Sequence, residues 1–100
     1  MSAVSFTILK QLGGHRFLQM TGAKQFVGDT LSLAFTLPRG TTRNKCNRVV
    51  ITLLPASDTY KVQFCSLYKT TIKTITTIVG VQAAELTEIF TQETGLLISL

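Results

Sequence analysis

The order of apolar and polar positions along this chain predicts a protein built mainly of β-strands. Residues 31–37 alternate between large apolar and small side chains up to Pro38, which predicts a strand that ends there. Residues 48–54 form an apolar, β-branched run, and residues 55–58 supply four consecutive turn residues. Residues 60–65 then alternate again. Two strands at residues 48–54 and 60–65, joined by the turn at residues 55–58, predict a β-hairpin.

The alternation also predicts which side chains of the hairpin share a face. Successive side chains of a strand point to opposite faces, so the apolar Tyr60, Val62 and Phe64 should face a core while Lys61 and Gln63 face away. By the same parity, an outward position is predicted for Arg48, Val50 and Thr52 on the preceding strand, with Lys73 joining them from a later one.

The segments before this region are shorter and less regular. Ser5–Leu12 reads as a short helix, with Ser5 as N-cap and Phe6, Leu9 and Leu12 on one stripe, although its Thr and Ile content leaves a strand open. Residues 16–20 fit a first strand, followed by a turn through Ala23 and Lys24. Residues 25–27 fit a second short strand.

The end of the chain predicts one more strand and one helix. Residues 68–79 are rich in Thr and Ile, which favour strands, and a bulge would reconcile this with the spacing of three between their isoleucines. Residues 83–93 have the apolar spacing of a helix, with Gly95 as its C′ residue. The apolar residues 96–100 should dock on the core or on a neighbouring subunit.

Together these elements predict a single α+β domain over residues 1–100. We expect an antiparallel sheet of about five strands, with the C-terminal helix packed on one face and a short N-terminal helix. Hydrophobic residues make up 45% of the chain, which is enough for one packed core.

Charge is distributed unevenly along the chain. Residues 1–81 carry all ten Lys and Arg residues against two acidic ones, a net charge of +8, whereas residues 82–100 carry three Glu and no base, a net charge of −3. The loop at residues 39–47 contains Arg39, Arg43 and Lys45 and no acid. This asymmetry indicates a polyanionic partner or association between unlike surfaces.

The sequence offers little to support catalysis, and we expect neither an enzyme nor a cofactor. Cys46 and Cys65 lack metal-binding spacing, so we expect two reduced thiols, with a disulfide across the hairpin as the alternative. His15 is the only histidine, and nothing in the sequence places it beside a thiol. Asp29 and Asp58 occur in turn contexts. We therefore predict no catalytic residue and no metal site.

Several phrases of the chain resemble a group of small proteins, of about this length, that are encoded by tailed bacteriophages and prophages. The phrases are Gln11-Leu12-Gly13-Gly14 with Phe17, Met20-Thr21-Gly22-Ala23-Lys24 with Phe26-Val27, Leu37-Pro38-Arg39, Val50-Ile51-Thr52-Leu53, Asp58-Thr59-Tyr60, Gly80-Val81 and Thr94-Gly95-Leu96. The resemblance implies a phage or mobile-element origin and supplies no catalytic residue. Gln63 stands where the group often has an acid, which makes this surface more basic.

No apolar run reaches the length of a membrane span, and the first residues lack the order of a secretory signal, so we expect a location in the host cytoplasm and no membrane partner. Our functional hypothesis is nucleic-acid binding through the sheet face and loop 39–47. Its phosphate contacts would be Arg39, Arg43, Lys45, Arg48, Lys61 and Lys73.

As a fold-level analogy, the predicted order of strands and helix resembles the Whirly and Pur type of single-strand binder. Two other readings stay open. One is a merely solvated cationic face. The other is a structural or protein-interaction component of a phage, in which the apolar termini with outward Val50 and Leu54 form a homo-oligomer.

Overall fold

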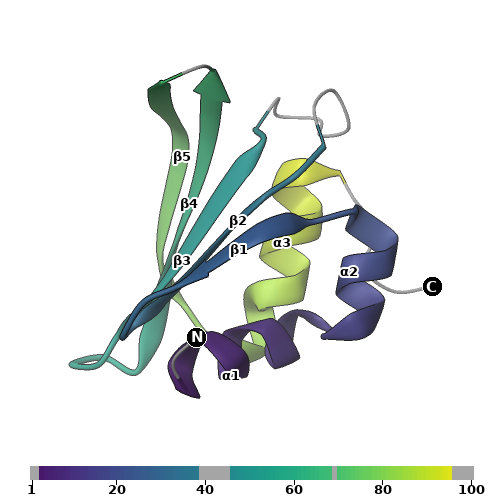
Figure 1. Cartoon of the computed structure of the whole chain (residues 1–100). Coiled ribbons are helices and arrows are strands. Elements are labelled where there is room, and N and C mark those ends of the chain that lie inside the picture. The colour runs from purple at the N-terminus through teal and green to yellow at the C-terminus, as the bar shows by residue number, and fades with distance from the viewer. Residues whose placement is uncertain (1–2, 39–45, 69, 96–100) are drawn as a thin grey trace.

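The molecule has two layers, a five-stranded antiparallel sheet and a set of helices on one side of it (Figure 1). The computed structural model describes residues 3–38, 46–68 and 70–95. The strands follow one another across the sheet in sequence order: β1 (Lys24–Gly28), β2 (Ser32–Thr36), β3 (Arg48–Leu54), β4 (Thr59–Tyr68) and β5 (Thr71–Val81). The helical elements are α1 (Ala3–Leu12), α2 (His15–Thr21), η1 (Ala83–Glu85) and α3 (Leu86–Thr94). The predicted α+β class, with an antiparallel sheet and a C-terminal helix packed against it, is confirmed.

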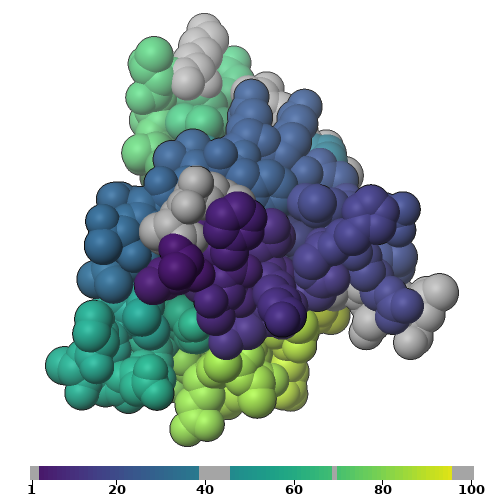
Figure 2. Space-filling view, turned by 60° about the horizontal axis from the view of Figure 1, so that its bottom comes forward, coloured from purple at the N-terminus to yellow at the C-terminus, as the bar shows by residue number. Residues whose placement is uncertain are grey.

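The core lies between the sheet and the helices. Alternate residues of the central strands are buried on this side, as the period of two requires: Leu33, Phe35, Val49, Ile51, Val62 and Phe64. The helices contribute Ile8, Leu12, Phe17, Leu86 and Phe90. Figure 2 looks at the end of the molecule where α1 lies, and it shows α1 in contact with both α2 and α3. The three helices therefore form one continuous cover over one face of the sheet.

Three phenylalanine rings join the helices to the sheet. Phe17 of α2 packs edge-on against Phe35 of β2 and Phe90 of α3, with ring centroids 5.2 Å and 5.3 Å apart. Phe35 and Phe90 complete the triangle at 6.2 Å. Each such pair contributes about 0.5–1.5 kcal/mol beyond the burial of its surface. The triangle thus fixes α2 and α3 on the same side of the sheet.

The first helix is confirmed, but its predicted cap is wrong and its predicted stripe is only partly right, since Leu12 is buried and Leu9 packs against the core. Ser5 is not an N-cap: it lies inside α1, and its hydroxyl donates to the carbonyl oxygens of Asp29 at 3.1 Å and Ser32 at 2.7 Å. The buried stripe contains Ser5, Ile8 and Leu12, while Phe6 is 58% exposed. A serine on the buried stripe is tolerated because Asp29, between β1 and β2, and Ser32, the first residue of β2, supply its acceptors.

The strand predicted for residues 16–20 is wrong, because this segment belongs to helix α2. Only Phe17 and Thr21 are buried in α2, and their spacing of four places them on one helical face. The Thr21 hydroxyl donates to the Phe17 carbonyl oxygen at 2.7 Å, within the helix. The burial of Phe17 in the aromatic triangle decides the conformation of a segment whose own pattern is too short to do so.

The other predicted strands are confirmed, including the hairpin and the bulge in the last strand. In β5, Phe64 pairs with Thr76 and Cys65 with Thr74, so Ile75 is an extra residue in the ladder. A second irregularity places two residues, Val79 and Gly80, opposite Lys61. Gly80 has a φ of 73°, which a glycine adopts without strain.

The C-terminal helix ends as predicted. Gly95 has a left-handed φ of 76° and donates its N–H to the Thr91 carbonyl oxygen at 2.8 Å. At the other end, Glu85 accepts a hydrogen bond from the Gln82 backbone N–H at 3.0 Å. The predicted docking of residues 96–100 lies outside the described residues.

A second polar contact, in addition to that of Ser5 with Ser32, ties α1 to the sheet. Tyr60 of β4 is buried, and its hydroxyl donates to Gln11 Oε1 at 2.9 Å. Burial raises the pKa of Tyr60 above its usual value of 10.0, the Gln11 hydrogen bond lowers it, and the charge of Asp58 raises it further. Because the pKa of Tyr60 is higher in the folded protein than in the unfolded chain, rising pH ionises the Tyr60 phenol of the unfolded chain first. The free energy of unfolding should therefore decline as the pH rises above about 10.

We expect Tyr60→Phe to reduce the free energy of unfolding by about 1 kcal/mol at neutral pH, since Gln11 loses its partner. The same variant should lose the decline in the free energy of unfolding above pH 10. Gln11→Ala removes the same hydrogen bond but keeps the phenol, so it should be similarly destabilised and keep the decline. Urea titrations at neutral and alkaline pH measure both effects, and a Tyr60→Phe protein that keeps the wild-type alkaline slope would contradict this assignment.

Candidate nucleic-acid interface

Among the residues that the structure describes, three cationic side chains lie on the side of the sheet opposite the helices, and we call this side the open face. Paired residues of neighbouring strands project on the same side, so the register defines the face. One row crosses all five strands and contains Lys24, Thr36, Arg48, Cys65 and Thr74. Two of its five members are therefore cations.

Side-chain contacts run along this row. The Arg48 guanidinium nitrogen Nη1 donates to the Thr36 hydroxyl oxygen at 3.3 Å, which holds the cation across β2 and β3. Cys65 is buried, and its sulfur lies 4.0 Å from the Thr74 hydroxyl oxygen. Arg48 itself is only half-buried. The guanidinium N–H groups of Arg48 that do not bond Thr36 can bond a ligand, and the Thr36 contact already holds the guanidinium in place.

Two further rows extend the open face. The next row contains Val27, Ala34, Val50, Gln63 and Thr77. The third contains Ser32, Thr52 and Lys61. The predicted outward parity of Arg48, Val50, Thr52, Lys61 and Gln63 is confirmed. These rows present hydroxyl, amide and small apolar groups between the cations.

Lys73 is not on the open face, contrary to the prediction. It pairs with Ser66, which follows Cys65 in β4 and so faces the side that carries the helices. The cause is the extra residue Ile75: without it, Lys73 would have the same parity as Thr77. Lys73 is exposed, on the opposite side of the sheet from Lys61.

The other three predicted phosphate contacts, Arg39, Arg43 and Lys45, lie outside the described residues. Lys24 was not among the predicted contacts, because the sequence placed it in a turn, yet it begins β1 and pairs with Thr36. The face on which Lys24 lies depends on the residue at which β1 begins. The pattern of so short a strand does not predict that residue.

The acidic residues lie elsewhere. All five fall within the described chain, and none belongs to a strand: Asp29 and Asp58 lie between strands, and Glu85, Glu88 and Glu93 belong to η1 and α3. Lys10 and Arg16 also lie in the helical layer, so the cations are divided between the two layers. The open face thus has cations without neighbouring carboxylates in its own rows.

Aromatic rings contribute little to the open face. Phe17, considered above as a core residue, has no exposed surface, and Phe26 packs beside Phe35 with centroids 5.5 Å apart. Tyr68 is 58% exposed at the end of β4. Base stacking of the kind used by many single-strand binders therefore has few platforms among the described residues of this sheet.

The residues considered for catalysis are dispersed. His15 is exposed at the start of α2, whereas Cys46 and Cys65 are buried and neither forms a disulfide. Within the described ranges, no three His, Cys, Asp or Glu side chains group closely enough to hold a metal ion. No helix of the described chain is both long and apolar enough to cross a membrane.

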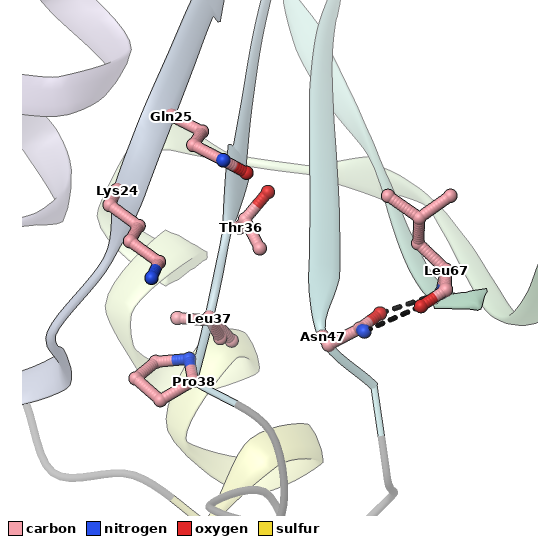
Figure 3. A pocket seen from close by; sticks show the side chains of 7 residues that line it. All are labelled: Lys24, Gln25, Thr36, Leu37, Pro38, Asn47 and Leu67. Carbon is pink, nitrogen blue, oxygen red and sulfur yellow. Dashed lines mark hydrogen bonds between the residues drawn. The ribbon is translucent and has the colours of Figure 1, made fainter. Parts of the chain in front are cut away.

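Asn47 fixes one end of the open face. Its amide nitrogen donates to the Leu67 carbonyl oxygen at 2.7 Å, and its amide oxygen accepts from the Leu67 N–H at 2.6 Å (Figure 3). Its backbone N–H donates to Cys65, and its carbonyl oxygen accepts from Leu37. Asn47 therefore links β2 and β4 at the point where β3 begins, next to Arg48.

Comparison with known proteins does not identify this chain, since no family model, no curated protein and no solved structure matches it.

We expect Asn47→Ala to destabilise the protein by about 1–3 kcal/mol, because two hydrogen bonds to Leu67 are lost. The Leu67 amide should then exchange its hydrogen faster, while amides at the centre of β3 change only with global stability. Ser57→Ala, in the turn at the other end of β3, is the control and should change stability by less than about 0.5 kcal/mol. Unchanged protection of the Leu67 amide would contradict the proposed role of Asn47.

Proposed function

We propose that this chain is a non-enzymatic protein of a phage or prophage that acts in the host cytoplasm and binds nucleic acid through the open face. The observation that supports the proposal most is the placement of Lys24, Arg48 and Lys61 on one side of the sheet, in rows that contain no carboxylate. Contacts from Lys and Arg to phosphate dominate the affinity of most nucleic-acid-binding proteins.

The spacing of the cations suits an extended ligand better than a single anion. Arg48 pairs with Cys65, and Lys61 is four residues from Cys65 along β4. At about 3.3 Å per residue, the two cations are separated by roughly 13 Å along the strands, too far to share one phosphate group. A polyanion that crosses the sheet would meet both.

The groups between the cations support the same proposal. Thr36, Thr52 and Thr77 lie in three different rows of the open face, and threonine hydroxyls bond phosphate and sugar oxygens. The loop that follows Pro38 adds Arg39, Arg43 and Lys45 in sequence, before the chain enters β3 at Arg48. With few exposed rings available, we expect the binding to depend on phosphate contacts and therefore strongly on salt.

We expect Lys61→Ala to weaken binding to single-stranded oligonucleotides and to reduce the slope of log K against log salt by about 0.7, the value for one phosphate contact. Lys10→Ala is the matched control, because Lys10 is an exposed lysine in the helical layer. Fluorescence anisotropy across a salt series measures both. Equal effects of the two substitutions, or no binding by the wild type at low salt, would refute the proposal.

A second candidate function, homo-oligomer formation, is favoured by the exposed edge of β5. This strand has eleven residues, and no other described strand pairs with its outer side. Ile72, Ile75 and Val79 are 53%, 39% and 65% exposed. An edge strand with unpaired backbone groups and few charges pairs readily with a copy of itself, and Lys73 is its only charged residue. We propose that β5 pairs with β5 of a second copy.

We expect the wild type to show about twice its chain mass of 11.0 kDa in size-exclusion chromatography with light scattering. Val79→Lys places a charge on the β5 edge and should shift the protein to the monomer. Val27→Lys, at a 55% exposed position of β1 on the opposite edge, is the control and should leave the dimer intact. A wild type that is monomeric at high concentration would exclude this mode of association.

A further inference from the structure

A hollow of about 430 Å³ lies at one end of the sheet, on the border of the open face (Figure 3). Four successive strands meet there, where β1 and β3 begin and where β2 and β4 end. The volume falls in the range of about 300–1,000 Å³ that is typical of small-ligand sites. Its lining residues are Lys24, Gln25, Thr36, Leu37, Pro38, Asn47 and Leu67.

The lining combines apolar walls with a few polar groups. Pro38 and Leu67 offer apolar surface, while Gln25 and Thr36 offer an amide and a hydroxyl. Figure 3 shows the Gln25 side chain extending from β1 toward Thr36. Asn47 also lines the hollow, but its amide is engaged by the Leu67 backbone. Gln25 is therefore the amide that is available to a ligand.

The backbone at Gln25 is unusual. Gln25 has a φ of 56°, a left-handed conformation that is uncommon for residues other than glycine, asparagine and aspartate. It lies where the register between β1 and β2 shifts, between Lys24 and Val27. Register shifts of this kind re-aim side chains, and residues held in such strained conformations cluster at ligand sites. Gln25 therefore lines the hollow from a left-handed position at an irregularity of β1.

We propose that the hollow holds one unstacked base of the bound nucleic acid, and that the Gln25 amide reads its edge. Unstacked bases are recognised by hydrogen bonds to their edges and by aromatic, arginine or apolar side chains against their faces, and Pro38 and Leu67 offer the apolar surface here. A glutamine amide matches the N6 and N7 atoms of adenine with two hydrogen bonds, so adenine is the preferred base. This inference rests on the proposed function.

The flanking cations fit a nucleotide in this position. Lys24 lines the hollow, and Arg48 donates to Thr36, which lines it as well. The two phosphates on either side of the captured base would meet these two side chains. The bound nucleic-acid strand would then continue along the open face toward Lys61.

The first test uses Gln25→Gly, which removes the amide and also relieves the left-handed strain, so the variant should fold at least as well as the wild type. We expect it to bind an oligodeoxyadenylate roughly 5- to 150-fold more weakly, the range for one two-bond base contact. Its affinity for an oligodeoxythymidylate should change little, and its salt slope should not change because no charge is altered. Gln63→Ala is the control, since it removes the same type of side chain from the open face outside the hollow.

The second test separates this inference from the proposed function. Deoxyadenosine monophosphate is added to the full chain, and the side-chain amide resonances of Gln25 and Gln63 are followed by NMR. A shift of Gln25 alone, together with the loss of adenine preference in Gln25→Gly, supports the inference. Oligonucleotide binding that Gln25→Gly leaves unchanged overturns the base site and keeps the proposed function.

Two further outcomes of the NMR experiment distinguish the proposed function from the base site. A Gln25 shift with deoxyadenosine monophosphate, in a protein that binds no oligonucleotide, overturns the proposed function and supports a nucleotide site in the hollow. An equal Gln25 shift with inorganic phosphate overturns the reading of a base.

Discussion

The contact of Phe17, Phe35 and Phe90 is the constraint on which the rest of this structure depends. Their rings lie 5.2–6.2 Å apart and come from α2, β2 and α3, which are far apart in sequence. Because all three rings are buried on one side, α2 and α3 are fixed over the same face of the sheet. None of the described helices covers the opposite face, and this asymmetry makes the sheet available as a surface.

The two irregularities of β5 then determine what that surface contains. Alternation alone would bring Lys73 to the open face, but the extra residue Ile75 reverses the parity and sends Lys73 to the other side. Nearer the end of the strand, Val79 and Gly80 together face Lys61. The cationic character of the open face therefore rests on β1, β3 and β4, while β5 contributes hydroxyl and apolar groups. A bulge of one residue changes the candidate ligand contacts as much as a substitution would.

The sequence predicted β2, the β3–β4 hairpin and the C-terminal helix from the period of their apolar residues, and it predicted the bulged β5 from its Thr and Ile content. It failed at residues 16–20, where a short mixed run becomes helical because tertiary packing buries Phe17 and Thr21 together. The parity of Arg48 and Lys61 could be counted, since an uninterrupted hairpin joins them. The hollow could not be predicted, because it depends on the positive φ of Gln25 and on four strand ends that are distant in sequence.

The two proposed functions are compatible in their geometry. Antiparallel pairing of β5 with its copy requires a two-fold axis perpendicular to the sheet, and such an axis keeps the open faces of both subunits on the same side. The result would be one continuous sheet with β1 at each outer edge, and with Lys24, Arg48 and Lys61 repeated in each half. Two linked cationic surfaces bind one polymer more tightly than either does alone, because the second contact is intramolecular. Self-association through β5 would therefore strengthen polyanion binding without any additional cation in the chain.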